Sequence, residues 1–266
     1  MGPMRAATTV LLGLIVVAQA AAQQPRPAPK PAAPAVPRRE AEVPFRVGEQ
    51  LTYDVAWQTY LIAGSATTTV VEKKPSFGST AYYIVAEGRP LPLIQRLYAL
   101  YYKMDTLFDS FSTLSQQSVL YAEEGKDRRT ATTRFDRAAR KALVERQSET
   151  VAREEVAVPP EATDGLATLY ALRARTFNAG DKLTVPVVDN GTLYSVTVEA
   201  TGPEHLRMRV GEFDAWNLRI TIVDPEKQPV GKNISVMMSR DERRLPLRIQ
   251  ADLPVGSFVL ALKEIK

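Results

Sequence analysis

The amino-acid sequence predicts a mainly β protein, built as a large curved antiparallel sheet or open β-barrel meander with one packed α-helix. Three observations predict this fold class. Apolar and polar residues alternate with a period of two in many short segments, as in strands that bury one face. Turn residues such as Asn190-Gly191 separate these segments, and clear helical periodicity is rare. Strands that follow one another without helices between them favour antiparallel neighbours over parallel crossover units.

The strands can be placed in order along the chain. The first follows the alternation of Leu51, Tyr53, Val55 and Trp57. In the first half, further strands are predicted at residues 67–73, 80–87, 98–108, 118–123, 130–136 and 141–145. In the second half they are predicted at residues 194–198, 206–210, 218–222, 234–238, 245–253 and 258–262. Predicted turns in the second half include Asn190-Gly191, Gly202-Pro203, Asp224-Pro225, residues 240–243 and residues 254–256.

One clear helix interrupts the strands. Thr163 or Asp164 is suited to cap it, and the segment 164–177 places a set of large side chains on one face. These are Leu166, Leu169, Tyr170, Arg173 and Phe177. We expect this helix to cover the sheet or plug it. A second, shorter helical turn is predicted at residues 92–97.

Residues 1–22 have the pattern of a secretory signal peptide. Arg5 gives a positive start, residues 6–18 form a short apolar core, and small residues follow for cleavage after Ala20 or Ala22. The core is shorter than the roughly 20 residues that span a bilayer, which favours cleavage over an uncleaved anchor helix. The sequence therefore predicts a periplasmic protein, with retention of the leader as an anchor left open.

Residues 23–44 are rich in proline and alanine and predict a disordered tether. Proline lacks an amide donor and holds φ near −65°, so this segment should be extended. It is either a spacer or a remnant left after cleavage. We expect the remaining residues, 45–266, to form a single β-rich domain.

The charge balance changes when the chain is divided. The full chain has 266 residues and a net charge of +4. Five of its 34 Lys and Arg residues precede Pro44, as do two of its 30 Asp and Glu residues, so the rest carries 29 basic and 28 acidic side chains. A nearly neutral domain lacks the clustered basic charge of a nucleic-acid-binding protein. Because there is no cysteine, burial and backbone pairing must hold the domain together without disulfides.

A series of short motifs, taken in order, carries a family resemblance. The motifs are FRVGEQLTY at residues 45–53, Trp57, Ala63-Gly64, Asp105, Asp109, Phe135-Asp136, Asp164-Gly165-Leu166, Tyr170-Ala171-Leu172-Arg173, Gly211-Glu212-Phe213, SRDERRLP at residues 239–246, and Gly256. This order resembles a bacterial exported family known as domain-of-unknown-function family 3108. The resemblance covers nearly all of the chain after Pro44. It implies an exported, sheet-rich domain, and it brings no activity with it.

The sequence gives little support to catalysis by histidine or metal. His205 is the only histidine, it lies in a predicted hairpin, and no Gly-x-Ser-x-Gly elbow is present to offer a serine. One histidine and no cysteine exclude the usual zinc ligand sets, and no acidic loop has the spacing of a calcium site. We therefore predict no catalytic residue, no metal and no cofactor.

Paired carboxylates are the remaining route to an enzyme. Two of Glu49, Asp54, Asp105 and Asp109 could cleave a glycosidic bond if they met in a cleft about 5 to 10 Å apart. The simpler interpretation of Glu49 is that it fixes a turn or pairs with an arginine. Convergence of two of these four groups is the condition that a glycan-directed envelope hydrolase would have to meet.

An aromatic and apolar stretch supplies candidate ligand-binding residues. The candidates are Trp57, Tyr60, Leu97, Tyr98, Tyr101 and Tyr102. They could form a flap over a lipophilic pocket or a patch for a membrane or partner, and the simpler alternative is that they fill the core.

The sequence thus predicts an exported, non-enzymatic, β-rich protein that binds a lipophilic or other cell-envelope ligand. Two alternatives stay open. One is the glycan-directed hydrolase, and the other is a protein-protein interaction module that uses an exposed sheet edge or the tyrosine-rich stretch. The expected partner is a lipid or envelope component, with no nucleic acid and no membrane-spanning segment after signal cleavage.

Overall fold

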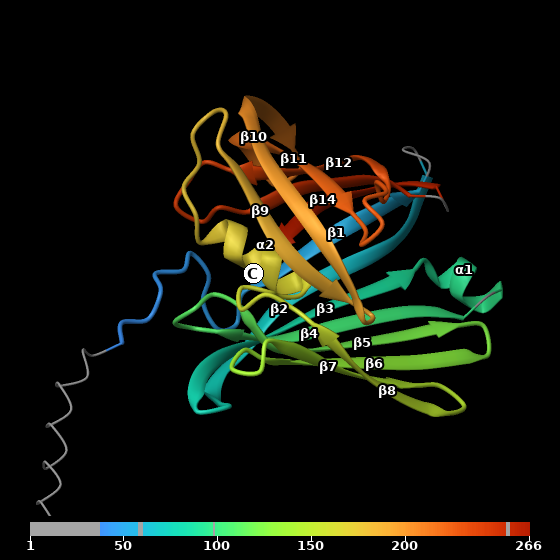
Figure 1. Cartoon of the computed structure of the whole chain (residues 1–266). Helices are drawn as coiled ribbons and strands as arrows, with labels where there is room; N and C mark the ends of the chain where they lie inside the picture. Colours follow the sequence, from blue (N-terminus) through green and yellow to red (C-terminus); the bar gives the residue numbers. More distant parts are fainter. Residues whose placement is uncertain (1–37, 58–60, 98, 254–255) are drawn as a thin grey trace, which may run out of the picture. The chain divides into compact units, whose positions relative to one another are not determined.

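The computed structural model describes residues 38–57, 61–97, 99–253 and 256–266, which form one fourteen-stranded antiparallel sheet and two short helices (Figure 1). The predicted leader and residues 23–37 of the predicted tether lie outside the described residues. The strand order is β8-β7-β6-β5-β4-β3-β2-β1-β14-β13-β12-β11-β10-β9, so consecutive strands pair and β1 also pairs with β14. The sheet does not close into a barrel, because β8 and β9 are its two edges. The predicted fold class is confirmed.

The first half of the sheet comprises β1 (Gln50–Trp57), β2 (Leu61–Ser76), β3 (Ser79–Pro90), β4 (Leu100–Asp109), β5 (Ser115–Glu124), β6 (Asp127–Asp136), β7 (Lys141–Gln147) and β8 (Val151–Ala157). The second half comprises β9 (Lys182–Asp189), β10 (Thr192–Met208), β11 (Gly211–Val223), β12 (Lys232–Ser239), β13 (Pro246–Leu253) and β14 (Gly256–Ile265). The helices are α1 (Pro92–Leu97) and α2 (Gly165–Arg173).

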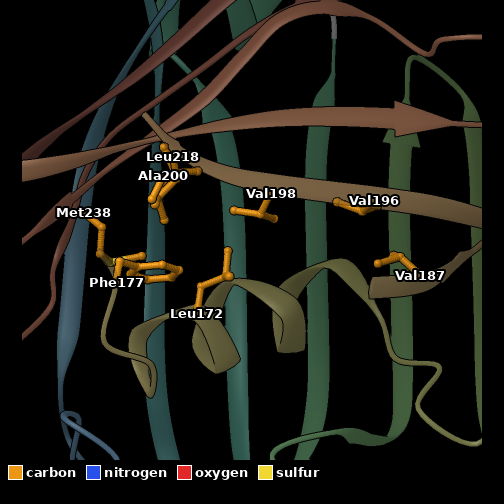
Figure 2. Packing of buried hydrophobic residues seen from close by; sticks show 9 residues of the cluster. Leu172, Phe177, Val187, Val196, Val198, Ala200, Leu218 and Met238 are labelled. Carbon is orange, nitrogen blue, oxygen red and sulfur yellow. The ribbon is translucent and has the colours of Figure 1, made fainter. Parts of the chain in front are cut away.

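Helix α2 packs on one face of the sheet, which we call the inner face. From one side of the helix, Leu166 and Tyr170 join a buried cluster with Ile84 of β3 and Phe108 of β4. From the other side, Leu172 joins a second cluster, which Figure 2 presents at close range. The residues labelled there are Leu172, Phe177, Val187, Val196, Val198, Ala200, Leu218 and Met238. The helix thus lies between the two halves of one curved sheet and fills the space that the curvature leaves.

The start of α2 is fixed by a buried carboxylate. Asp164 accepts a hydrogen bond from the backbone N of Ala167 at 2.8 Å, as an N-cap residue does, and its other oxygen accepts from Thr106 Oγ1 at 2.6 Å. Burial raises the pKa of Asp164, while hydrogen bonds from Ser115 and Thr106 oppose that shift. The cap therefore also ties the helix to β4.

Helix α2 ends at Arg173, earlier than the predicted end at residue 177. Phe177 nevertheless lies in the core, in the cluster that contains Leu172, because the chain turns after the helix and returns toward β9. The predicted cap at Asp164 and the shorter helix at residues 92–97 are both confirmed.

Three features of the sheet differ from the sequence prediction. The edge strands β8 and β9 were not among the predicted strands. The predicted turn at Gly202-Pro203 is wrong, because β10 runs continuously through it and pairs with β11 across a bulge between Ala200 and Gly202. A bulge bends its strand and increases the local twist, so the bulge between Ala200 and Gly202 changes the direction of β10 without ending the strand.

The folded part begins before Phe45. The backbone N of Ala41 donates to Ser110 O at 2.8 Å, and Glu40 lies 2.5 Å from Lys73 Nζ. Val43 also packs against the cluster formed by Ile84 and its neighbours. Residues 38–44, which were assigned to the tether, are thus attached to the domain.

Candidate functional site

The inner face carries an apolar row that leaves the core. The row is Ala200, Leu218, Val236, Ile249, Leu260 and Val55, each the direct cross-strand partner of the next, from β10 to β1. Directly paired residues project on the same face of a sheet. Ala200, Leu218 and Val236 are buried in the cluster that contains Leu172 of α2, whereas Ile249 and Val55 are half-exposed. The apolar face therefore continues beyond the part that α2 covers.

A second row of apolar residues lies beside the first on the strands β1, β14 and β13. Trp57, Phe258 and Ala251 are direct partners across β1, β14 and β13. The side chain of Trp57 is 42% exposed and lies against Gly256, where an added Cβ would be 2.3 Å from the indole Nε1. We call the six residues that these two rows place on β1, β13 and β14 the apolar strip. They are Val55, Trp57, Ile249, Ala251, Phe258 and Leu260.

The other half of the sheet is also apolar on its inner face. Ala86, Met104 and Leu120 are direct partners across β3, β4 and β5, and all three are half-exposed. Ala86 follows Ile84 by two residues, so it projects on the same face as that buried core residue. Both halves of the sheet therefore present uncovered apolar side chains on the face that α2 partly occupies.

The predicted ligand-binding residues do not form one group. Trp57 belongs to the apolar strip, and Tyr102, the partner of Gly88, lies on the inner face two residues from Met104. Tyr101 projects on the opposite face, where it donates to Glu87 and lies under the guanidinium of Arg89 at 4.8 Å. Tyr60 and Tyr98 lie outside the described residues. Leu97 ends α1, and its side chain lies outside the described part of the chain.

The apolar strip includes residues that sequence reasoning missed as site residues. Val55, Ile249, Ala251, Phe258 and Leu260 all belong to alternating patterns that were interpreted as ordinary core faces. Alternation identifies the residues that share a face, but it does not tell where a covering helix stops. One signal in the sequence could have indicated these residues. The predicted strands have more apolar faces than one nine-residue helix can cover, so some of these faces must remain partly exposed.

A buried ion pair lies at the base of the inner face. The side chain of Arg173 is fully buried and meets Glu49 at 2.6 Å and 3.0 Å through its two terminal nitrogens. The same guanidinium donates to the carbonyl oxygens of Arg244 and Arg243, both at 3.1 Å. Burial acts to lower the pKa of Arg173, but Glu49 outweighs it and the pKa is raised. The arginine is therefore charged, and its interactions join α2 to the start of β1 and to the turn before β13.

Aromatic rings surround this ion pair. The guanidinium of Arg173 lies 5.3 Å from the ring centre of Phe45 and 5.1 Å from that of Tyr170. Tyr53 donates to Pro246 O at 3.0 Å, and burial raises the pKa of its phenol well above the ordinary value. Arg173 and Tyr53 are paired and the rings are packed, so the cluster has the character of a structural support for the inner face.

The four carboxylates proposed for glycan cleavage have separate partners. Glu49 pairs with Arg173, Asp54 with Lys263 at 2.8 Å, and Asp105 lies 3.9 Å from Lys103. Asp109 accepts hydrogen bonds within its own loop, from the backbone N of Phe111 and Ser112 and from Ser112 Oγ and Gln116 Nε2. Within the described ranges no two of the four share a partner. The interpretation of Glu49 as the partner of an arginine is confirmed.

The environment of Asp109 shifts its titration. Burial acts to raise the pKa, but hydrogen bonds from Ser79, Ser112 and Gln116 outweigh it and hold the pKa of Asp109 below 3.8. The carboxylate is therefore ionised near neutral pH and serves as a hydrogen-bond acceptor for the turn after β4.

The part of the chain that the structure describes contains no arrangement typical of a histidine-based catalytic site, a metal site or a membrane-spanning helix. His205 lies in β10, exposed to solvent and 3.1 Å from Asp214, and not in the predicted hairpin turn. No group of three histidine, aspartate or glutamate side chains gathers there as metal ligands would. No described helix combines the length and the apolar character needed to cross a membrane.

Comparison with known proteins identifies the family. The sequence profile of a family described as a protein of unknown function (DUF3108) matches residues 52–263. The chain belongs to this family. No curated protein matches it in sequence. Three of the motifs that resemble this family are distant in sequence but meet at the buried ion pair. They contain Glu49, residues 170–173 and residues 239–246.

One solved structure supports the fold of this DUF3108 member, and two others align more weakly. A β-barrel-like protein of the domain-of-unknown-function family DUF1849 from Brucella abortus aligns with a TM-score of 0.54 at 11% identity, over 83% of this chain and 97% of that chain. A Bacteroides fragilis protein with a YmcC-like fold, suggested to be exported, aligns with a TM-score of 0.35 at 10% identity, over 86% and 100%. A suggested lipoprotein from Parabacteroides distasonis gives 0.34 at 10% identity, over 86% and 100%.

Proposed function

We propose that this protein is exported to the periplasm and binds a lipophilic cell-envelope molecule along the apolar strip, without catalysing a reaction. The observation that carries the proposal is the cross-strand row from Ala200 to Val55. It runs in register from the buried core to side chains that remain half-exposed, and it continues to Trp57, which is 42% exposed. Exposed apolar area of this kind is unfavourable in water, and an acyl chain or similar ligand would remove it from water.

The uncharged character of the strip indicates the chemical class of the ligand. All six residues are apolar, and Trp57 is the only one with a polar group, its indole N–H. Each buried methylene contributes about 0.8 kcal/mol, which corresponds to roughly fourfold in affinity. Binding by the strip should therefore strengthen by about this factor for each added methylene of a fatty acid.

The test uses the position of Trp57. The chain has two tryptophans, and Trp57 is in the apolar strip while Trp216 packs beside Met238 near the end of α2. A brominated fatty acid quenches indole fluorescence at short range. We expect saturable quenching in the unaltered protein and its loss in Trp57→Phe, which retains Trp216 as an internal reference.

A matched pair of variants distinguishes the strip from the rest of β1. Val55 and Ala56 are adjacent and project on opposite faces of the strand. Val55→Gln should weaken fatty-acid binding at least tenfold, and Ala56→Gln should leave it unchanged. Mass spectrometry of a solvent extract of the purified protein adds an independent readout. The proposal fails if no lipid is recovered and no probe binds, or if both variants bind as the unaltered protein does.

The export part of the proposal rests on the pattern of residues 1–22. Expression with a C-terminal tag, followed by cell fractionation, should place the protein in the periplasm. Sequencing of its amino terminus should give a chain that begins after Ala20 or Ala22. Recovery in the cytoplasm with an intact Met1 would contradict it.

Neither alternative function has a specific observation in its favour. The hydrolase requires two carboxylates to converge, and the four candidates each have their own partner. The interaction module requires an edge that another strand can join. The edge strand β8 carries Arg153, Glu154 and Glu155 in succession, and charged residues on an edge disfavour pairing with another chain.

A further inference from the structure

A cleft lies on the outer face of the sheet, which is the face opposite the apolar strip. Asp54, Ala261 and Arg248 are direct partners across β1, β14 and β13. They alternate along these strands with Val55, Leu260 and Ile249 of the strip, so they project on the other face. The cleft has a volume of about 330 Å³. Its lining residues are Asp54, Leu206, Arg207, Met208, Arg209, Arg248, Val259, Ala261, Leu262 and Lys263.

The shape of the cleft follows from one small residue and one bent strand. Ala261 stands in the row between Asp54 and Arg248, and its methyl group leaves space between the two larger side chains. The opposite wall comes from Leu206 and Met208 of β10, beyond the bulge that redirects that strand. The cleft thus has an apolar floor and wall with charged groups around them, and its volume is in the range of small-ligand pockets.

The charge of the cleft is unbalanced. Four of its lining residues are basic and one is acidic. The carboxylate of Asp54 is already paired with Lys263 at 2.8 Å, and Arg207 pairs with Glu212 at 2.9 Å. Arg209 and Arg248 have no hydrogen bond or ion pair with another side chain within the described ranges. The cleft therefore holds two guanidinium groups that no described side chain pairs with.

Arg248 adds an independent sign of a missing partner. Its Nε is buried and has no hydrogen-bond partner among the described residues. A buried donor without an acceptor is unfavourable, whereas a ligand oxygen at that position would satisfy it. Guanidinium groups bind phosphate oxygens through two parallel hydrogen bonds, which a single ammonium group cannot reproduce.

We propose that this outer cleft is a binding site for a phosphate group, with Arg248 as the principal ligand-binding residue. The charge of Arg209 adds to the attraction, and Leu206 and Met208 contact the apolar part of the molecule that carries the phosphate. That molecule is a phospholipid with its headgroup in the cleft, or a free phosphate. The charged residues Asp54 and Arg248 project on the other face from the strip, so the phosphate site does not rest on the proposed lipophilic ligand.

Three variants separate binding from folding. Arg248→Met removes the guanidinium but keeps an unbranched side chain. Because Nε has no partner among the described residues, we expect no loss of stability. Ala261→Leu fills the floor of the cleft and leaves all charges in place. Arg219→Met is the control, because Arg219 is an exposed residue of β11 outside the cleft with no side-chain partner among the described residues.

The experiment is isothermal titration calorimetry of the full chain with inorganic phosphate and with short-chain phosphatidylglycerol below its micelle concentration. We expect saturable binding that weakens as salt is raised. Binding should be at least tenfold weaker in Arg248→Met and Ala261→Leu and unchanged in Arg219→Met. Tighter binding of phosphatidylglycerol than of phosphate identifies a lipid headgroup, and equal binding identifies free phosphate.

Two results would overturn the proposal. The first is the absence of saturable binding of either probe by the unaltered protein. The second is binding that Arg248→Met and Ala261→Leu leave unchanged while both variants keep the unaltered unfolding midpoint. Loss of phosphatidylglycerol binding in Val55→Gln, with phosphate binding retained, would assign the lipid to the strip and leave the phosphate site in place.

Discussion

The buried ion pair makes a sharp prediction about stability. In Arg173→Met the carboxylate of Glu49 remains in place with its side chain only 11% exposed, and its cationic partner is gone. The carbonyl oxygens of Arg243 and Arg244 also lose the donors that reached them at 3.1 Å. The variant therefore keeps the cost of burying a charge and loses the attraction that offset it.

The size of the effect follows from these contacts. Removal of one partner of a buried ion pair costs about 3–5 kcal/mol, because the remaining charge is buried without compensation. For a domain of this size, each kcal/mol changes the melting temperature by roughly 2–4 °C. We therefore expect Arg173→Met to lower the melting temperature by about 6–20 °C.

Thermal unfolding followed by circular dichroism measures the melting temperature, urea unfolding measures the free energy of unfolding, and a second ion pair serves as the control. Arg153 and Glu145 meet at 2.6 Å with side chains 78% and 45% exposed, so Arg153→Met should cost less than about 1 kcal/mol. The double variant Glu49→Leu with Arg173→Met removes both charges and should recover part of the loss. Similar losses in Arg173→Met and Arg153→Met, or no recovery in the double variant, would refute the reasoning.

Three further predictions concern the stability of single regions of the fold. In Gly64→Ala the new Cβ would lie 2.3 Å from Arg89 O, so we expect a loss of stability in urea unfolding, whereas Gly165→Ala at the open start of α2 should gain up to about 1 kcal/mol. The pKa of Asp109 is held below its ordinary value, so its ionised form stabilises the fold at neutral pH and the contribution is lost as the pH falls through the lowered pKa. Asp109→Asn should therefore be less stable than the unaltered protein at pH 7, and this difference should narrow as the pH falls through the lowered pKa. A difference that does not change with pH would contradict this. Arg146→Met removes contacts of 3.0 Å and 2.6 Å to Asn190, and it should speed amide exchange in the β9–β10 hairpin with little change in global stability.

The alternation of apolar and polar residues in the sequence was sufficient to predict the class of fold and the positions of most strands. Alternation of the kind seen from Leu51 to Trp57 arises because one face of a strand is buried, so it is strong wherever a strand has neighbours on both sides and a core beneath it. The pairing of β1 with β14, which makes one sheet of the two halves, has no local signature. It depends on the curvature of the whole sheet and was therefore beyond sequence reasoning.

The candidate site was harder to predict than the fold, and Tyr101 and Tyr102 illustrate why. The sequence places them side by side in an apolar stretch, which suggests a common site. In a strand, consecutive side chains project on opposite faces, so Tyr102 reaches the inner face and Tyr101 packs with Glu87 and Arg89 on the other. The same sequence predicts a strand here, and adjacent residues of a strand cannot share a face. Proximity in sequence was therefore the wrong criterion for grouping Tyr101 with Tyr102.

The two strands that were not predicted are both edges of the sheet, and this has a physical reason. Most of β8 is exposed, so no alternating apolar pattern is required of it, and β9 contains Pro186, which an edge strand tolerates. The edges nevertheless approach each other, because Val156 of β8 and Val188 of β9 belong to one cluster. Side chains can pack across this seam without the backbone pairing that would close a barrel. The open seam and the short helix α2 thus have the same consequence for function, since both leave part of the apolar inner face uncovered.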